Sequence, residues 1–306
     1  MTDSTLKLQI ANAPCSWGVL EFEEHAAAGY DYARVLDEMR AAGYDGTELG
    51  DWGFMPTDPG HLREALNARS LSLVGAFVPV RLADARMHDE GVKSAIRTAT
   101  LLKDAGFPDA YVVLADDIAA SPERTANAGR LRPEHRLGEA GRATFAAGAE
   151  LVAREVRRAT GVRTVFHHHC ASYIETPEEI RDLMDRTDSG VLGLCLDTGH
   201  LTYAGGEPVA AIREFGSRIW HVHLKDCSEA VSLRARELHW DYNNAVRNGV
   251  FCELGQGAVD FAGVLDGLAG VPYSGWTVVE QDVLPALGTP AASASRNREF
   301  IRRLGL

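Results

Sequence analysis

Eight short apolar runs recur along the chain, and each is separated from the next by a segment with helical periodicity. The runs are rich in Val, Leu and Ile and lack polar alternation, which is typical of strands buried on both faces of a parallel sheet. They cover residues 8–13, 46–50, 71–78, 110–115, 163–168, 192–197, 219–224 and 276–281. Eight strand-helix repeats predict a (β/α)8 TIM barrel, usually roughly 250 residues long. We expect one barrel domain over residues 1–306.

Two long connections account for the length beyond a minimal barrel. Residues 115–135 follow the fourth run and residues 227–261 follow the seventh. Loops after barrel strands lie at the C-terminal face, where such enzymes build their sites. We therefore expect both to be lids, the second part-helical or in contact with another subunit. An open doubly wound sheet is the rival fold, but no G-x-G-x-x-G follows the first run.

Composition limits the partners of the chain. The net charge of −12 disfavours nucleic acid and anionic membranes, so a small neutral or weakly charged substrate is expected. The sequence contains neither a signal peptide pattern nor roughly 18 uninterrupted apolar residues, which predicts a cytoplasmic protein without membrane contact. The five cysteines form no C-x-x-C pair and are expected to be free thiols. A homo-oligomer is compatible with these features.

Histidines and carboxylates end the last four runs. His167, Asp197, His223 and Glu280 come one from each of strands five to eight. Imidazole nitrogen and carboxylate oxygen that converge from separate segments suit a divalent transition metal, here Mn²⁺ or Co²⁺, with Zn²⁺ or Fe²⁺ as alternatives. His169 lies two residues after His167 and faces the same side of its strand, so it is an alternative ligand.

Further polar and aromatic side chains lie near the same strand ends. Glu48 closes the second run and is a candidate for binding substrate hydroxyls, while Trp17 and Trp52 offer apolar faces for a ring or pack in the barrel. Lys225 either contacts a substrate oxygen or forms an ion pair outside the pocket. Glu175 precedes Thr176 and Pro177, a pattern that favours helix initiation.

Several of these segments carry a specific resemblance, in the same order and over nearly the whole chain. The segments N-A-P-C-S-W-G-V, G-T-E-L-G, F-H-H-H, L-D-T-G-H, H-V-H-L-K-D and V-V-E-Q-D resemble those of the xylose-isomerase-like TIM-barrel superfamily. Within it, the sequence is most similar to the inosose dehydratase family. The triple histidine is the most discriminating of these motifs, because the others are shared with sugar epimerases and isomerases.

The resemblance implies metal ligands at Asp197, His223 and Glu280. The fifth-strand position, usually Glu in the epimerases, is His167 here. Epimerases use two glutamates on opposite faces of the sugar, so this replacement suits a one-sided reaction with one base and one acid. The resemblance also makes His200 a residue that contacts substrate or transfers protons, with orientation of Asp197 as the alternative role.

The implied activity is metal-dependent dehydration of a cyclic keto-polyol, scyllo-inosose to a trihydroxycyclohexane-dione and water, in inositol catabolism. Glu280 or a histidine would remove the α proton, and an imidazolium of His200 or His169 would protonate the departing hydroxyl. A sugar isomerase or epimerase is the first alternative. Apurinic endonucleases share the barrel but need a basic face. A non-catalytic sugar sensor is the remaining alternative.

Overall fold

The fold was analysed in a computed structural model that describes residues 8–18, 30–118, 121–282 and 288–306. Eight parallel strands form a closed barrel in the order β1-β10-β7-β6-β5-β4-β3-β2. The strands are β1 (Leu8–Asn12), β2 (Gly46–Glu48), β3 (Ser72–Val80), β4 (Tyr111–Asp116), β5 (Arg163–His167), β6 (Leu192–Asp197), β7 (Ile219–Leu224) and β10 (Gly275–Val279). The predicted (β/α)8 barrel is therefore confirmed.

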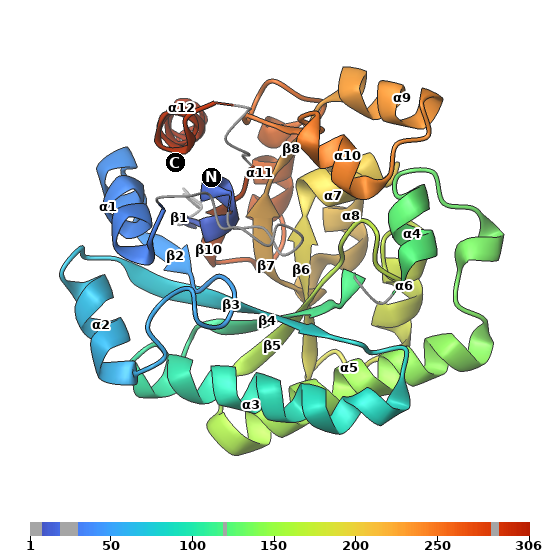
Figure 1. The fold of residues 1–306 in the computed structure, drawn as a ribbon, viewed down its shortest axis with the longest axis horizontal. Helices are drawn as coiled ribbons and strands as arrows, with labels where there is room; N and C mark the ends of the chain where they lie inside the picture. The colour runs from blue at the N-terminus through green and yellow to red at the C-terminus, as the bar shows by residue number, and fades with distance from the viewer. Residues whose placement is uncertain (1–7, 19–29, 119–120, 283–287) are drawn as a thin grey trace.

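Helices surround the barrel and cover the outer faces of its strands (Figure 1). They are α1 (Tyr32–Ala42), α2 (Pro59–Asn67), α3 (His88–Asp104), α5 (Glu139–Thr160), α6 (Pro177–Arg186), α7 (Thr198–Tyr203), α8 (Pro208–Phe215), α11 (Phe261–Ala269) and α12 (Pro290–Arg303). The main hydrophobic core lies between the strands and this outer layer. Within the described residues, no helix combines the length and apolar character needed to cross a bilayer.

Local sequence signals set the helix starts. Thr176 caps α6, accepting the backbone N–H of Glu179, while the Glu179 carboxylate accepts the N–H of Thr176. This reciprocal pair satisfies N–H groups that an α-helix leaves without partners in its first turn. Pro177 at the first helical position supplies a fixed φ suited to the turn. The predicted helix start is confirmed.

The connection after β4 contains α4 (Pro122–Asn127) and a 3-10 turn at Pro133–His135. The connection after β7 contains a two-stranded sheet of β8 (Asp226–Cys227) and β9 (Phe251–Cys252), with α9 (Glu229–Glu237) and α10 (Tyr242–Arg247) between them. Figure 1 shows α10 near α4, and residues of the two helices are in contact. We call the two connections together the cap.

Candidate metal centre and active site

Four strand ends bring the predicted ligands together. His167 ends β5 and Asp197 ends β6, while His223 lies one residue before the end of β7. A register shift between β6 and β7 places Asp197 directly beside His223. Glu280 follows β10, and its N–H donates to the carbonyl of Leu224. One potential ligand atom from each of these four residues lies within 4.8 Å of all the others.

The inward-facing atoms of this group have the geometry of metal donors. His223 Nδ1 lies 3.3 Å from Glu280 Oε2 and 3.8 Å from Asp197 Oδ2, while His167 Nε2 is 3.6 Å from Asp197 Oδ2. Among the described residues, His167 Nε2, Asp197 Oδ2 and His223 Nδ1 find no hydrogen-bond partner although they are buried. Buried polar atoms without partners are costly, and a shared cation would satisfy all three. Two nitrogens and two carboxylates suit Mn²⁺ or Co²⁺.

Glu48 fixes the orientation of His223. Glu48 Oε1 accepts hydrogen bonds from His223 Nε2 at 3.0 Å and from His221 Nε2 at 2.8 Å. His223 therefore keeps a proton on Nε2, and Nδ1, which faces the other three donors, is the ring nitrogen available to a metal. Burial opposes ionisation of Glu48, but His223 and His221 outweigh it and lower its pKa to about 2. Glu48 lines the cavity, as expected, yet one of its oxygens is committed to these histidines.

Two hydrogen bonds fix Asp197, one at its carboxylate and one at its backbone N–H. Its Oδ1 accepts the N–H of His200 at 2.7 Å and caps α7, which leaves Oδ2 for the other donors. The N–H of Asp197 donates to His168 Nε2 at 3.1 Å. The outward-facing histidine of the triple motif thus positions the backbone of a neighbouring strand end.

The two alternative ligands, His167 at the end of β5 and His169 in the loop after it, differ in their contacts. Neither ring nitrogen of His167 has a hydrogen-bond partner among the described residues, whereas His169 Nδ1 bonds the carbonyl of Cys170 at 2.6 Å. His169 Nε2 lies 3.3 Å from the hydroxyl of Tyr242. These contacts favour His167 as the ligand and leave His169 for another role.

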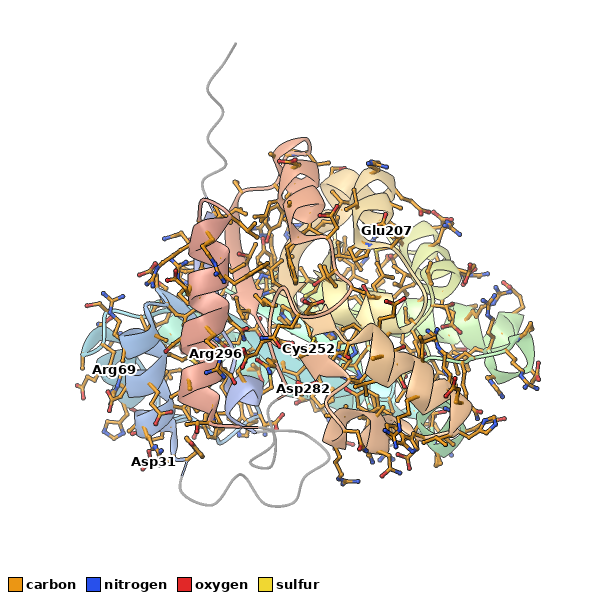
Figure 2. The ribbon with its side chains drawn as sticks, turned by 90° about the horizontal axis from the view of Figure 1, so that it is seen from above. Asp31, Arg69, Glu207, Cys252, Asp282 and Arg296 are labelled. Atoms are coloured by element: carbon orange, nitrogen blue, oxygen red, sulfur yellow. The ribbon has the colours of Figure 1, made fainter. Side chains whose placement is uncertain are left out.

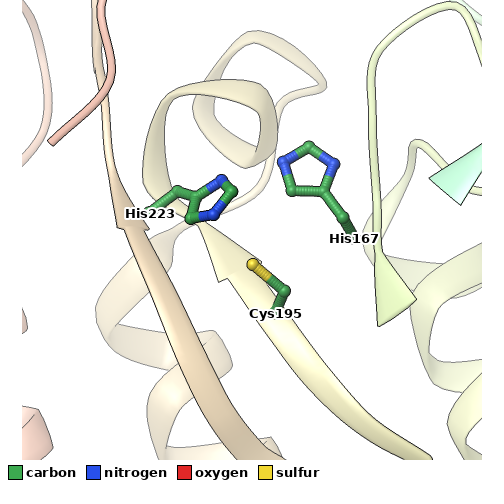
Figure 3. Close-up of side chains that lie close together, drawn as sticks. All are labelled: His167, Cys195 and His223. Atoms are coloured by element: carbon green, nitrogen blue, oxygen red, sulfur yellow. The ribbon is translucent and has the colours of Figure 1, made fainter. Parts of the chain in front are cut away.

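Cys195 lies just below His167 and His223, as Figure 3 shows. A cysteine binds metal as a thiolate. Burial raises the pKa of Cys195 to about 12, so the thiol stays protonated at neutral pH. Asp197 and Glu280 are better donors because they are already anionic; burial opposes ionisation of Glu280, but His223 and Lys225 outweigh it and lower its pKa well below the usual value.

His167, His223 and Glu280 line an open cavity at the mouth of the barrel, and Asp197 lies buried directly behind them. His169 and His200 also line it, with ring centroids 3.9 Å apart. Burial, followed by the charges of neighbouring side chains, lowers the pKa of both rings well below the usual value. Both are therefore neutral at neutral pH, which differs from the imidazolium expected from the sequence.

Lys225 lies inside this cavity and not outside the barrel. Its Nζ is 3.2 Å from both oxygens of Asp282, 3.3 Å from Glu280 Oε2 and 3.3 Å from His200 Nε2. Asp282, labelled in Figure 2, was not singled out from the sequence, although it ends the V-V-E-Q-D segment. The pair places a fixed cation beside Glu280 and His200.

The two tryptophan candidates lie elsewhere. Trp17 is completely buried in the main core, and its indole N–H donates to Glu38 on α1 at 2.7 Å. Trp52 stacks under Arg97 at 4.0 Å. Neither lines the cavity. Of the two roles that the sequence left open for Trp17, its complete burial favours packing between the barrel and α1 over substrate binding.

The cap joins the cavity through Tyr242 on α10. Gly129 is the point where its two connections meet: Arg236 on α9 donates to the Gly129 carbonyl at 3.0 Å, and the Gly129 N–H donates to Glu175 at 2.7 Å. Glu175 also accepts the N–H of Ala171 at 2.7 Å. Glu175 thus ties the loop after His169 to the cap, a role that helix initiation did not reveal.

Comparison with known proteins identifies the family of this chain. Residues 28–304 match the model of the xylose isomerase-like TIM barrel. The chain belongs to this family. It is 32% identical over 300 residues to an inosose dehydratase of Bacillus thuringiensis (strain Al Hakam), covering 98% of this chain and 97% of the relative. The predicted likeness to inosose dehydratases is confirmed.

A second relative and a solved structure are also similar to this chain. The rhizopine catabolism protein MocC of Rhizobium meliloti is 34% identical over 303 residues, covering 99% of this chain and 90% of that protein. A crystal structure of the probable 3-DHS dehydratase AsbF of Bacillus anthracis superposes with a TM-score of 0.69 at 12% identity, covering 96% and 99% of the two chains. That likeness supports the barrel fold alone.

Proposed function

We propose that this family member is a metal-dependent dehydratase of a cyclic keto-polyol. It would convert scyllo-inosose to a trihydroxycyclohexane-dione and water in inositol catabolism. The observation that carries this proposal is the 32% sequence identity to an inosose dehydratase, which extends over 98% of this chain. An open cavity lined by three of the four donors and by His200 supports it.

His167, Asp197, His223 and Glu280 would hold the metal, with Mn²⁺ or Co²⁺ as the first candidates. A divalent ion bound there would act as a Lewis acid and make the hydrogen α to the substrate ketone easier to remove. Glu48 would keep the His223 lone pair directed at the metal position.

The reaction moves two protons, and side chains of the cavity would transfer both. Glu280 or His169 would take the proton from the carbon α to the ketone, and His200 would supply a proton to the β-hydroxyl oxygen as it leaves. The C–H electron pair becomes the new C=C bond, and the C–O pair departs with the oxygen as water. Lys225 would contribute positive charge beside His200 where the hydroxide departs.

The fifth-strand residue favours dehydration over epimerisation. With His167 in place of the epimerase glutamate, among the described cavity residues no carboxylate lies on β5 to reprotonate the opposite face of the ring. An enolate formed on one side would then expel the β-hydroxyl.

The decisive experiment incubates the Mn²⁺-loaded protein with a panel of inososes and ketohexoses. Appearance of dione absorbance from an inosose supports the proposal. Interconversion of ketose epimers without dione would replace it with an epimerase function. Binding without any turnover would indicate a sugar sensor.

A further inference from the structure

Asp51 belongs to the wall of the cavity that lies opposite the metal donors. The donors lie on or directly after β5, β6, β7 and β10, whereas Asp51 follows β2 and Phe77 lies on β3. In the closed order of the barrel, β2 lies four strands from β6 in either direction, and β3 stands in the same relation to β7. A ring-shaped ligand that spans the mouth from the donors therefore meets Asp51 and Phe77 on its far side.

The backbone around Asp51 is held in a fixed turn. The N–H of Phe54 donates to the carbonyl of Asp51 at 3.0 Å. Gly50 has φ +72°, and a Cβ at this position would lie 3.0 Å from Pro14. Glycine adopts this conformation at no steric cost and allows the close approach to Pro14. The turn therefore places the Asp51 side chain at a defined point of the cavity wall.

The carboxylate of Asp51 contributes nothing to this turn. Among the described residues, no group donates a hydrogen bond to it and no cation pairs with it. Burial raises the pKa of Asp51, and no neighbouring charge offsets this effect. Glu48, by contrast, accepts hydrogen bonds from His221 and His223. A half-buried carboxylate without donors is unfavourable, and hydroxyl groups of a bound ligand would supply them.

The chemistry of a cyclic polyol matches this wall. An ionised carboxylate has two oxygens, and both only accept hydrogen bonds, so hydroxyls on two neighbouring ring carbons can each donate to one of them. The hydroxyls of scyllo-inosose are all equatorial, so neighbouring pairs project from the rim while the axial hydrogens make both faces apolar. Phe77 is half-buried and lines the cavity, so its ring offers an apolar surface to one of these faces.

We propose that Asp51 binds the pair of neighbouring hydroxyls on the ring edge opposite the reacting edge, and thereby selects cyclic polyols that carry this pair. The inference rests on the proposed dehydratase function and names a substrate-binding residue for it. The ketone carbon and the α carbon form the reacting edge, which faces the donor group. The opposite edge carries the hydroxyl para to the ketone and one neighbour, and neither of these is the hydroxyl that leaves.

Asp51 contacts atoms that do not react, so its hydrogen bonds are equally strong in the ground state and the transition state. Asp51→Ala should therefore raise KM for scyllo-inosose roughly 10- to 100-fold and change kcat little. Asp51→Asn keeps one acceptor oxygen and should give an intermediate KM. Asp109→Ala, at an exposed position before β4 at the opposite end of the barrel, is the matched control and should behave as wild type. Loss of kcat with unchanged KM in Asp51→Ala would overturn the proposal.

The selectivity is tested with an inosose that lacks the hydroxyl para to the ketone. Wild-type protein should use this analogue with a kcat/KM roughly 10- to 100-fold lower than that for scyllo-inosose. Asp51→Ala should use the two compounds with similar kcat/KM, because it has lost the group that distinguishes them. Discrimination that persists in Asp51→Ala would show that another residue recognises this edge, and the assignment would then be wrong.

A third measurement needs no turnover. Because scyllo-inositol has no ketone and does not undergo the reaction, its binding to the Mn²⁺-loaded protein reports recognition of the ring alone. By isothermal titration, wild type and Asp109→Ala should bind it alike, and Asp51→Ala should bind it roughly 10- to 100-fold more weakly. Equal affinities in wild type and Asp51→Ala, or no binding by wild type, would contradict the role of Asp51.

Failure of the proposed function gives a different result. Wild-type protein would then form no dione from any inosose, whatever its affinity for scyllo-inositol. Weaker binding of scyllo-inositol by Asp51→Ala would still assign Asp51 to recognition of the ring in that case.

Discussion

Asp197 and His223, two of the four donors at the barrel mouth, each have one atom held by the protein and another without a hydrogen bond among the described residues. Both ring nitrogens of His167 lack such partners. Asp197 uses Oδ1 for α7, and His223 uses Nε2 for Glu48. Such division orients a ligand before the metal arrives. Single substitutions should therefore affect metal binding in distinct ways.

His167 at the end of β5 and His169 in the following loop give the first prediction. His167→Ala should lose bound Mn²⁺, because it removes a donor, whereas His169→Ala should retain the metal and lose rate. Asp197→Ala serves as the reference for complete loss of bound Mn²⁺. Elemental analysis after gel filtration measures the metal content of all three. Full metal content in Asp197→Ala or His167→Ala would contradict the assigned donor set.

A second prediction concerns the residue that orients His223. Glu48→Gln should weaken Mn²⁺ binding by roughly 10- to 100-fold, because an amide cannot accept as an anion from both His221 and His223. Isothermal titration of the metal-free protein gives the affinity. Glu64→Gln, at an exposed position on α2, is the control and should bind as wild type. Equal affinity in Glu48→Gln would show that Glu48 does not support the metal.

Among the strands and helices, the sequence predicted which polar residues lie at the strand ends, but it did not predict the contacts that the cap makes with the cavity. Parallel strands deliver their C-terminal residues to one edge, so four polar residues at matching depth could be brought together without knowledge of any loop. Tyr242 reaches the cavity only because the connection after β7 folds against the loop after β5. Tyr242 is 73 residues from His169, and no periodicity encodes that contact. The hydrogen bond from Trp17 to Glu38 on α1 was likewise not predicted from the sequence.

Gly129, where the two connections of the cap meet, gives a third prediction. Gly129 has φ +74°, and a Cβ there would lie 2.8 Å from the Tyr203 ring. Gly129→Ala should therefore combine backbone strain with displacement of the cap, lowering both the melting temperature and kcat/KM. Gly161→Ala is the matched control, because Gly161 has φ +81° with no heavy atom within 4 Å. It should show the backbone cost, about 1–2 kcal/mol, without loss of activity. Equal activity in the two variants would separate the cap from catalysis.

For the whole molecule, one buried carboxyl group sets a pH dependence of stability. Asp116 ends β4; its Oδ2 accepts the N–H of Tyr173, while its Oδ1 has no partner among the described residues. Burial, as the largest influence, raises the pKa of Asp116 to about 7. The folded state therefore binds a proton more tightly than the unfolded chain, whose Asp titrates near 3.9. This contribution is present at low pH and is lost as the pH rises from about 4 through 7.

The fourth prediction follows from the stability that the folded protein loses as Asp116 ionises with rising pH. Asp116→Asn cannot ionise, so its stability relative to wild type should increase between pH 5 and pH 8, by an amount on the order of 1 kcal/mol or more. Thermal melts at both pH values, with chelator in every sample, measure the difference without a contribution from metal. Asp117→Asn, at the next position on the surface side, is the comparison. A constant difference between Asp116→Asn and wild type would contradict the raised pKa.

The separation between barrel and cap also bears on how such a protein can change over evolutionary time. The four donors belong to strand ends, which the closed hydrogen-bonded barrel holds in register, while Tyr242 belongs to a segment inserted after β7. The inserted segment can vary in length and sequence without shifting any strand. Substrate selectivity can thus diverge among descendants of one ancestor while the group of side chains at the strand ends is inherited unchanged.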